Sequence, residues 1–535
     1  MAASPAQQKV LGAYYTDEAV ATFIAGWALR SRSDSALDPS CGDGVFLSAA
    51  FQRLRRLGNQ TGQILGVDID RVALRAARLR EPASQLLEQD FFSLKPGDIP
   101  PVTAIIGNPP FIRYQTFNGS SRSNALSRTR EVGVELPQLS SSWAPFLVHA
   151  AGFLKKGGRL GMVAPAELAH AQYARQVLLF VFRVFGRVTI RAFHEKLFPD
   201  LSQDTFLLLC EDYGKECDWC SVVPAVNLAE IGTKETHGLP IDIKAIQSGS
   251  RRLTHYLLPP KARHLYEAMT ETKGVARLGS AADVGIGYVT GANDFFHLTH
   301  SESRAWRIPS RYLRKAILSL ADFEGTALRA DDWKRSLLLG QKVYLLALPE
   351  SIGKKLPKDV SRYLSEGIAR NIPARFKCRV RKTWYVVPHV RLGEALLAYM
   401  SGPSPKLIAN TANLVAPNTL HVLRFKKGWK VNHLAAGWYS SLTRLSCELE
   451  GHPLGGGMLK LEPSEAENVL IALPYRNDTP KLFNELDVLL RSGLTSEAMD
   501  IADSRILRRR FGLSASECLT LRESARYLEV WRMHR

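Results

Sequence analysis

Residues 36–47 of the chain read Ala-Leu-Asp-Pro-Ser-Cys-Gly-Asp-Gly-Val-Phe-Leu. This stretch predicts a strand, a glycine-rich turn and the start of a helix, because Gly42 and Gly44 allow the backbone to turn sharply and to approach a ligand closely. A dinucleotide-binding fingerprint would place a third glycine at position 47, where this chain has leucine. The two glycines alone leave open whether the turn binds a ligand or only joins two elements.

Acidic residues also follow the next two predicted strands. Asp68 ends the apolar run Ile64–Val67, and Asp90 precedes Phe91 after a further apolar segment. A carboxylate at Asp68 can accept both hydroxyls of a ribose, while Asp90 can accept from an adenine amino group and Phe91 can pack on the ring. Any one acid alone could be a solvated turn residue. Because ligands of open α/β sheets bind at the carboxyl ends of the strands, three such ends in succession predict a site for an adenosine-bearing ligand.

Up to about Cys210, apolar strand-like runs alternate with helical segments, which is the pattern of a doubly wound, Rossmann-like α/β sheet. The predicted strands include Ile64–Val67, Val102–Ile106, Arg159–Val163 and Phe206–Leu209, and the predicted helices include Arg71–Arg80 and Trp143–Leu154. Residues 211–250 are acidic and are predicted to be an irregular linker. Shorter strands and frequent turns then indicate a mixed α+β domain, and the chain from Pro480 onward is predicted to be helical. We therefore expect a catalytic domain over 1–245, a second domain over 246–475 and a helical segment over 476–535.

The turn after the strand Val102–Ile106 reads Gly107-Asn108-Pro109-Pro110-Phe111. The two prolines fix φ and remove two N–H donors, so the turn is rigid and its carbonyls are free to accept. The Asn108 side-chain oxygen and the Pro109 carbonyl can hold both hydrogens of an aromatic amino group and direct its lone pair at a methyl donor. Phe111 can stack on the base. A tight loop without chemistry is the alternative for this turn in isolation, but after three cofactor-type strand ends we expect catalysis by orientation and hydrogen bonding.

These motifs resemble those of the gamma-type amino-methyltransferases of bacterial restriction–modification systems, over roughly residues 11–210. The resemblance implies a class I S-adenosylmethionine-dependent fold and site-specific methyl transfer to N6 of adenine in duplex DNA, with the base flipped out of the helix. Asn rather than Ser at position 108 favours adenine N6 over cytosine N4. The segment Gly12-Ala-Tyr-Tyr-Thr16 resembles the family's amino-terminal cofactor motif.

The same resemblance implies roles for individual residues. Thr16, Asp38 and Gly42 would contact the methionine end of S-adenosylmethionine, Asp68 the ribose, and Asp90 and Phe91 the adenine. The full expected cofactor-binding set is Tyr15, Thr16, Asp38, Pro39, Gly42, Gly44, Asp68, Ile69, Asp90, Phe91 and Asn108. The expected catalytic set is Asn108, Pro109, Pro110, Phe111 and Phe198. Phe198 lies in Leu197-Phe-Pro-Asp200 and would contact the flipped base, although Phe193 is close by. No metal ion is expected.

Positive charge is concentrated in one part of the chain, whose net charge is +19. Residues 251–450 carry 32 Lys and Arg against 15 Asp and Glu, whereas residues 1–250 carry 26 against 24. Uniform basicity would say little, but a basic block predicts an anion-binding surface, here for the phosphates of double-stranded DNA.

Particular segments of the chain are expected to contact DNA. Arg375–Tyr385 is the sharpest of them, and if it is extended, Lys377, Arg379 and Arg381 share one face. The expected DNA-binding set is Arg113, Lys377, Arg379, Arg381, Lys382 and Trp384. The polar loops Tyr288–Asp294 and Asn410–Asn413 are expected to read base edges, Gly455–Gly457 to permit close backbone approach, and Ser120–Arg130 to form a mobile loop that orders on DNA.

Other functions stay open on the sequence alone. RNA adenine-N6 methylation could use the same pocket. Protein glutamine methyltransferases share an Asn-Pro-Pro-aromatic turn, but they are short and need no basic block. A DNA-binding module with a degenerate methyltransferase fold is disfavoured because the cofactor and catalytic positions are intact. We find no convincing Asp…Glu-x-Lys nuclease motif, so a restriction endonuclease or defence-system subunit is expected to be a separate chain.

The composition fits a globular protein, with 45% apolar and 23% charged residues. No apolar run approaches the roughly 20 residues of a membrane-spanning helix, and the amino terminus lacks a signal-peptide pattern, so a cytoplasmic location without membrane contact is expected. The 7 cysteines are scattered. Cys217 and Cys220 form a lone C-x-x-C, and a zinc site would need a second pair, so reduced thiols are expected.

Overall fold

The computed structural model describes residues 16–112, 116–171, 173–193, 205–225, 227, 238–352, 356–454 and 457–533. The chain divides into two compact units, an amino-terminal one that ends at Pro260 and a carboxy-terminal one over Lys261–Met533. The division lies at residue 260, whereas the sequence suggested a boundary near 245. Each unit is described by itself.

The amino-terminal unit is built on a sheet of nine described strands in the order β3-β2-β1-β4-β5-β7-β6-β8-β9. The strands from β3 to β5 are parallel, and β7 runs antiparallel to both β5 and β6. The strands are β1 Ala36–Asp38, β2 Ile64–Asp68, β3 Gln85–Glu88, β4 Val102–Gly107, β5 Leu154–Pro165, β6 Phe185–Phe193, β7 Thr205–Tyr213, β8 Trp219–Ala225 and β9 Leu239–Pro240. This confirms the doubly wound α/β fold, with β1 central between β2 and β4.

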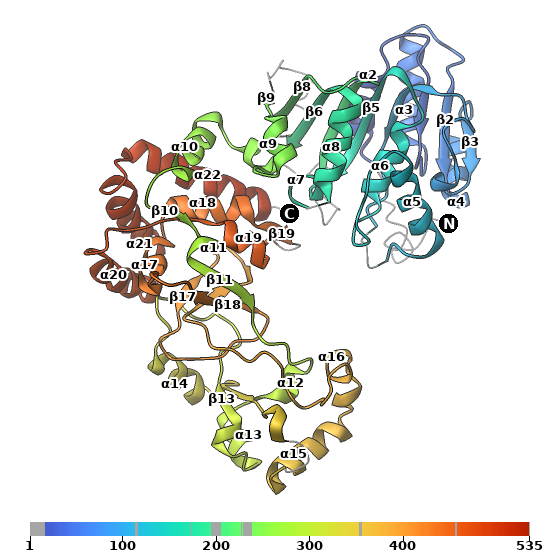
Figure 1. Ribbon diagram of the computed structural model, residues 1–535. Coiled ribbons are helices and arrows are strands. Elements are labelled where there is room, and N and C mark those ends of the chain that lie inside the picture. The colour runs from blue at the N-terminus through green and yellow to red at the C-terminus, as the bar shows by residue number, and fades with distance from the viewer. Residues whose placement is uncertain are drawn as a thin grey trace. The chain divides into compact units, whose positions relative to one another are not determined.

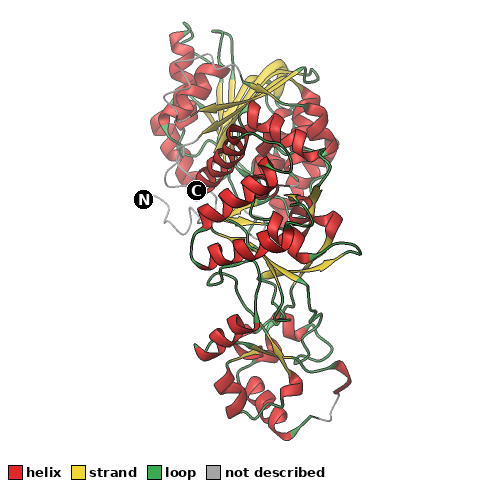
Figure 2. Cartoon of the chain, turned by 90° about the vertical axis from the view of Figure 1, so that its left-hand side faces the viewer, coloured by secondary structure: helices red, strands yellow, loops and turns green. Residues whose placement is uncertain are grey.

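Helices cover both faces of this sheet (Figure 2). They are α2 Glu18–Ala28, α3 Val45–Arg56, α4 Arg71–Arg80, α5 Gly119–Glu131, α6 Trp143–Ala151, α7 Glu167–His170, α8 Ala174–Val184 and α9 Ile243–Ser248, with the short 3-10 turns η1 Phe91–Ser93 and η3 Leu253–Leu257. Helix α4 begins where the sequence predicted, because Asp70 caps it by accepting from the N–H of Val72 at 2.8 Å. Helices α2 and α3 pack together over an apolar core that includes Ile24, Phe46 and Ile106.

Two expectations for this unit are wrong. Residues 211–250 are not a linker, because β8 pairs in parallel with β6 and buries Cys220, Val222 and Val223. The acidic residues Glu211 and Asp212 end β7, and Glu216 and Asp218 lie in the short connection to β8, so the acidic composition concealed a strand. Residues Ser120–Arg130 lie within helix α5, which buries Ala125, Leu126 and Thr129, and they are not a loop.

The carboxy-terminal unit contains a four-stranded sheet in the order β11-β18-β15-β17, two three-stranded sheets, β12-β14-β13 and β16-β20-β19, and the pair β10-β21. The strands are β10 Val275–Arg277, β11 Ala282–Ile286, β12 His297–Leu298, β13 Leu313–Lys315, β14 Tyr344–Leu346, β15 Ala395–Ala398, β16 Met400–Ser401, β17 Leu407–Ala409, β18 Leu420–Phe425, β19 His452–Leu454, β20 Met458–Lys460 and β21 Leu470–Ala472. The mixed α+β character is as predicted.

The helices of this unit gather in two groups (Figure 1). The first group is α12 Asn293–Phe296, α13 His300–Ala305, α14 Ala330–Leu338, α15 Lys358–Ala369 and α16 Phe376–Arg379. The second is α10 Pro260–Thr270, α11 Leu278–Ala281, α17 Val431–Gly437, α18 Ser441–Glu450, α19 Pro463–Asn468, α20 Thr479–Arg491, α21 Thr495–Ala502 and α22 Ala515–Met533. The helical prediction for the chain after Pro480 is confirmed, and α22 packs against α18 within the unit. Across the described ranges, no helix combines the length and apolar character needed to cross a membrane.

Candidate active site

Asp38 ends the central strand β1 and is almost fully buried, with a 1% exposed fraction. Its Oδ1 atom accepts from the N–H of Ser40 at 3.1 Å. Its Oδ2 atom is buried and has no hydrogen-bond partner among the described residues. Burial raises the pKa of the Asp38 carboxyl well above its ordinary value, with nearby Asp68 adding to the rise. A buried carboxylate oxygen left without a donor is a position that a ligand's donor group can fill.

The glycine-rich turn that follows has the backbone geometry expected of it. Gly42 has φ 52° and Gly44 has φ 86°, and both values lie in the left-handed region that favours glycine. A Cβ atom on Gly44 would come within 3.0 Å of Ala77 in α4, so only glycine allows this close packing. Pro39 is buried beside the turn.

Asp68, at the end of β2, holds this turn in place. One carboxylate oxygen accepts from the N–H of Gly42 at 2.8 Å and the other from the N–H of Asp70 at 2.9 Å. Burial raises the pKa of the Asp68 carboxyl, and these two hydrogen bonds act in the opposite direction. Ile69, the next residue, is 63% exposed. Asp68 therefore connects the end of β2 to the turn after β1, and Ile69 presents an exposed apolar side chain beside them.

The third strand end differs in part from the expectation. Asp90 is half-buried and accepts from the N–H of Phe92 at 3.0 Å. Phe91 is 3% exposed, and its ring lies 5.0 Å from that of Phe146 and 4.8 Å from that of His149, measured between centroids. The expected stacking of Phe91 on an adenine ring is therefore wrong for this structure, because aromatic side chains of α6 already surround that ring.

The Asn108–Phe111 turn follows β4 directly and is anchored to the β1 turn and to the chain before α2. Ser40 Oγ donates to the Asn108 carbonyl at 3.3 Å, and Asn108 Nδ2 donates to Thr16 Oγ1 at 3.2 Å. Asn108 Oδ1 is buried and has no hydrogen-bond partner among the described residues. Phe111 is half-buried and packs against the same core as α2 and α3. A Cβ atom on Gly107 would come within 2.8 Å of Asp38 Oδ1, so glycine at this position allows the two strand ends to touch.

Ser142 is a residue of this site that the sequence did not reveal. Its Oγ donates to the Pro110 carbonyl and accepts from the N–H of Ile112 at 2.8 Å. Its own N–H donates to the Ile112 carbonyl at 3.0 Å. Ser142 is 1% exposed and immediately precedes α6. It therefore fixes the far side of the turn, and a serine before a helix carries no sequence signal for this role beyond helix capping.

Parallel pairing explains why these residues meet. β1 pairs with β2 on one side and with β4 on the other, so Asp38, Asp68 and the Asn108 turn lie at the carboxyl edge of adjacent strands. Tyr15, Arg113 and Phe198 lie outside the described residues, so their expected roles remain predictions. The same holds for Gly455 and Gly456.

The expected DNA-binding segment Arg375–Tyr385 is not an extended strand. Residues Phe376–Arg379 form helix α16, so the common face predicted for Lys377, Arg379 and Arg381 is wrong. Arg381 donates to the carbonyls of Val289 at 2.6 Å and Thr290 at 2.8 Å. Its guanidinium therefore braces a loop within the unit.

Trp384, another residue expected to contact DNA, also has a role within the unit. Trp384 packs on Phe295, with 5.8 Å between ring centroids, in the core around α12 and α15. Lys377, Arg379 and Lys382 are exposed, and their expected contact with DNA remains a prediction.

The two polar loops expected to read bases are also held by internal bonds. Tyr288 Oη and His297 Nε2 share a buried hydrogen bond of 2.8 Å, and Asp294 pairs with Arg375 at 2.6 Å. Asn410 is buried, and its amide donates to the carbonyls of Gly393 at 2.9 Å and Leu414 at 2.8 Å. These polar side chains stabilise turns, so base reading by them is not supported.

Two family models match different parts of the chain. Residues 2–172 match the family described as N-6 DNA Methylase. Residues 250–507 match the C-terminal domain of the type II methyltransferase M.Eco57I. Together with the cradle at Asp38, Asp68 and Asn108, these matches decide the assignment. The chain carries an N-6 DNA Methylase domain over residues 2–172 and is similar over residues 250–507 to the C-terminal domain of a type II methyltransferase. Its cofactor is S-adenosylmethionine, and it is an adenine-specific enzyme.

Individual relatives extend over most of this methyltransferase. Type II methyltransferase M.AccI of Acinetobacter calcoaceticus is 19% identical over 471 residues, covering 86% of this chain and 84% of the relative. M.XamI of Xanthomonas campestris pv. amaranthicola is 23% identical over 475 residues, covering 86% and 85%. The type IIL restriction–modification enzyme MmeI, solved in complex with DNA, has a similar fold with a TM-score of 0.60 and 13% identity, covering 98% of this chain and 80% of that one.

Proposed function

We propose that this methyltransferase acts on an adenine flipped out of duplex DNA, as the modification enzyme of a gamma-class restriction–modification system whose endonuclease is a separate chain. The observation that carries the proposal is the state of Asn108. Its amide nitrogen donates to Thr16, while its side-chain oxygen is buried and has no partner among the described residues. A buried acceptor without a hydrogen bond costs free energy until a ligand supplies a donor. The amino group of a target base is such a donor.

The cofactor-binding residues fit S-adenosylmethionine. Asp38 Oδ2 is the second buried oxygen at this edge without a partner, and it suits the positively charged amino group of the methionine end. Asp68, fixed by two backbone N–H groups, suits the ribose hydroxyls, and Asp90 suits the adenine amino group. When bound, S-adenosylmethionine supplies an electrophilic methyl group.

The residues of the turn orient the nucleophile. Asn108 Oδ1 and the Pro109 carbonyl accept the two amino hydrogens, which draws the amino nitrogen towards tetrahedral geometry and frees its lone pair. The flanking carbonyls of Asn108 and Pro110 already accept from Ser40 and Ser142, so these two serines hold the turn in position. Phe111 stacks on the base. No strong general base is required, because the proton leaves after the methyl group has been transferred.

Base flipping is part of the proposal because a stacked adenine cannot bring its amino group to a buried oxygen. Extruding the base costs a few kcal/mol, which contacts to the DNA backbone must offset. The basic block of residues 251–450 supplies charge for such contacts. A protein substrate would not require a basic block of this size.

The test compares three substrates under one assay. Radiolabelled methyl transfer is measured with duplex DNA, transfer RNA and a ribosomal release factor, and the modified base is then identified by nuclease digestion and mass spectrometry. N6-methyladenine in duplex DNA alone is the expected result. Preferred labelling of RNA or of a glutamine side chain would overturn the proposal. Sequencing of methylated DNA from expressing cells would then give the recognised site.

A further inference from the structure

A hollow of about 520 Å³ in the carboxy-terminal unit lies along the edge strand β11. One wall is the β11 end, Asp283–Val289, another is the segment around His389 and Arg391, and the third is β18 with Val422 and Arg424. β11 pairs with β18 along Ala282–Ile286, and its other edge has no strand partner in this sheet. An edge strand presents unpaired backbone groups, which are suitable for polar contacts to a ligand.

The two arginine side chains of this hollow make, within the described part of the protein, no contacts of the kind that other arginines of the unit make. Arg391 and Arg424 are both exposed, and neither guanidinium has an ion pair or hydrogen bond to another described residue. The acidic residue of the hollow, Asp283, pairs with Lys426 at 3.7 Å. By contrast, Arg375 pairs with Asp294 and Arg381 donates to backbone carbonyls. Unpaired guanidinium groups beside a hollow attract an anion.

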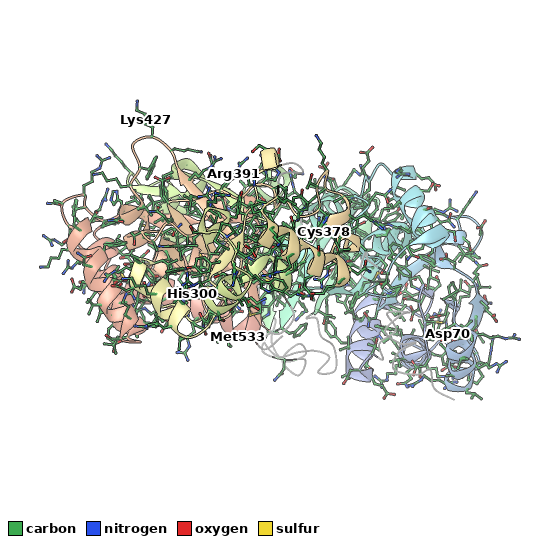
Figure 3. The ribbon with its side chains drawn as sticks, turned by 90° about the horizontal axis from the view of Figure 1, so that it is seen from below. Asp70, His300, Cys378, Arg391, Lys427 and Met533 are labelled. Atoms are coloured by element: carbon green, nitrogen blue, oxygen red, sulfur yellow. The ribbon has the colours of Figure 1, made fainter. Side chains whose placement is uncertain are left out.

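A second hollow of about 460 Å³ adjoins the first, because Pro388 and His389 line both. It adds Arg311 and Arg314, with Glu350 as its acidic residue. The positive surface therefore continues past one hollow. In Figure 3 the labelled Arg391 and Lys427 lie towards the same side of this unit, and Lys427 projects from the loop that follows β18.

The surface between the cations suits a nucleic-acid backbone. Gly285 is exposed and adds no side chain to the wall, and Ile286 is 55% exposed and offers an apolar contact. Gly287 must be glycine, because a Cβ atom there would come within 2.3 Å of the Ala416 and Pro417 carbonyls. A low, glycine-lined floor between guanidinium groups lets a phosphate chain approach closely.

We propose that the first hollow binds the phosphate backbone of duplex DNA through Arg391 and Arg424. We call it the β11 groove and define it by Asp283–Val289, Pro388, His389, Arg391, Val422 and Arg424. The proposal rests on the proposed function, because it assigns the DNA surface of the same enzyme. It replaces the segment Arg375–Tyr385 as the main expected DNA-contact segment. We assign phosphate contact and not base reading because both arginine side chains are exposed and no neighbouring side chain among the described residues holds them in a fixed orientation.

The test measures duplex binding by the full chain as a function of salt concentration. Each phosphate contact contributes a slope of about −0.9 in log affinity against log salt, so Arg391→Ala with Arg424→Ala should flatten the slope by about 1.8 units. The matched control is Lys481→Ala with Arg509→Ala, which removes the same charge from two exposed cations of the carboxy-terminal helical region. The control should keep the parental slope, and all variants should keep the parental unfolding temperature and cofactor affinity.

Conservative variants separate phosphate contact from base reading. Arg391→Lys with Arg424→Lys should retain the parental slope, because an ammonium group contacts phosphate as a point charge. Loss of affinity for one sequence only would overturn the phosphate assignment, since the planar guanidinium of a base-reading arginine is not equivalent to an ammonium at a bidentate contact. If the double alanine variant kept the parental salt dependence and still methylated duplex DNA, only the assignment of the β11 groove as a phosphate-binding site would be overturned. Failure of the parental enzyme to methylate duplex DNA would instead overturn the proposed function.

Discussion

Asn108 keeps its side-chain oxygen buried and unbonded within the described structure, while its amide nitrogen donates to Thr16. Replacing Asn108 with alanine removes the acceptor that orients the target amino group. We expect methyl transfer to fall by on the order of 10²–10³-fold, as for loss of one hydrogen-bonding group that acts in the transition state. Single-turnover methylation of duplex DNA measures this loss.

Two controls accompany that measurement. Asn468→Ala replaces an exposed asparagine at the end of α19 and should leave turnover unchanged. Calorimetry should show near-parental affinity of Asn108→Ala for S-adenosylmethionine. If Asn108→Ala retained near-normal turnover, the assignment of the catalytic turn would be wrong.

The raised pKa of the Asp38 carboxyl makes the folding stability depend on pH. The folded protein binds the Asp38 proton more tightly than the unfolded chain, so the stability from this group is present at low pH and is lost as pH rises through the folded-state pKa. Because burial disfavours the charged form of Asp38, the ligand-free protein is less stable at neutral pH than it would be with an uncharged group at this position. Asp38→Asn keeps the oxygen that accepts from Ser40, so it should raise the unfolding temperature at pH 7 by on the order of a few degrees.

The same variant should bind the cofactor more weakly, because an amide lacks the charge that attracts the methionine amino group. Loss of a charged hydrogen-bond partner corresponds to about 1–3 kcal/mol. Differential scanning calorimetry and titration calorimetry measure the two effects. A lower unfolding temperature together with unchanged affinity would show that Asp38 supports the fold and does not bind the ligand.

At the scale of elements, Ser142 connects the start of α6 to the turn after β4. Its hydroxyl bridges the Pro110 carbonyl and the Ile112 N–H, so Ser142→Ala frees two backbone groups beside the catalytic residues. Misplacement of the turn should lower kcat by on the order of 10–10²-fold with little change in cofactor affinity. Ser140→Ala is the matched control, because the Ser140 hydroxyl bonds to the Pro137 carbonyl and not to the turn. Equal losses in the two variants would indicate a general effect on folding.

The elements that sequence predicted well are those whose local signals agree with their packing. Helix α4 has the predicted bounds because Asp70 caps it and its apolar residues have helical spacing. The strand ends at Asp38 and Asp68 meet because consecutive βα units place them on adjacent parallel strands. The turn after β4 was predicted because two prolines that follow a strand fix the backbone there.

The elements that sequence missed depend on contacts that local patterns do not encode. Strand β8 lies in an acidic segment, and only its pairing with β6 makes it a strand. The segment around Lys377, whose cations would share one face only if it were extended, is helical, and Cys378 is buried against the loop at Thr290. Phe91 follows a strand-end acid, but α6 supplies aromatic neighbours that bury its ring. Ser142 reaches the turn across about thirty residues of sequence, and no spacing rule predicts that contact.

At the scale of the whole molecule, the position of the boundary between the units can be tested by truncation. The segment after residue 245 contains η3, where Leu253, Tyr256 and Leu257 are each less than 5% exposed. This turn packs on β8 and α7, and Tyr256 Oη accepts from the Asp242 N–H at 3.1 Å. Removing it would take away three large buried side chains and expose the surfaces that they cover.

A fragment of residues 1–260 is therefore expected to fold and bind S-adenosylmethionine, whereas a fragment of residues 1–245 is not. Full burial of a large apolar side chain contributes about 1.5–3 kcal/mol, so losing three removes an amount comparable with the whole stability of a domain, about 5–15 kcal/mol. The two fragments are compared by thermal unfolding and cofactor titration, with the full chain as the control. The longer fragment should also lack the salt-dependent duplex affinity of the full chain, because the basic block lies beyond residue 250. Equal stability of the two fragments would place the boundary at 245, and duplex affinity equal to that of the full chain would show that the amino-terminal unit binds DNA unaided.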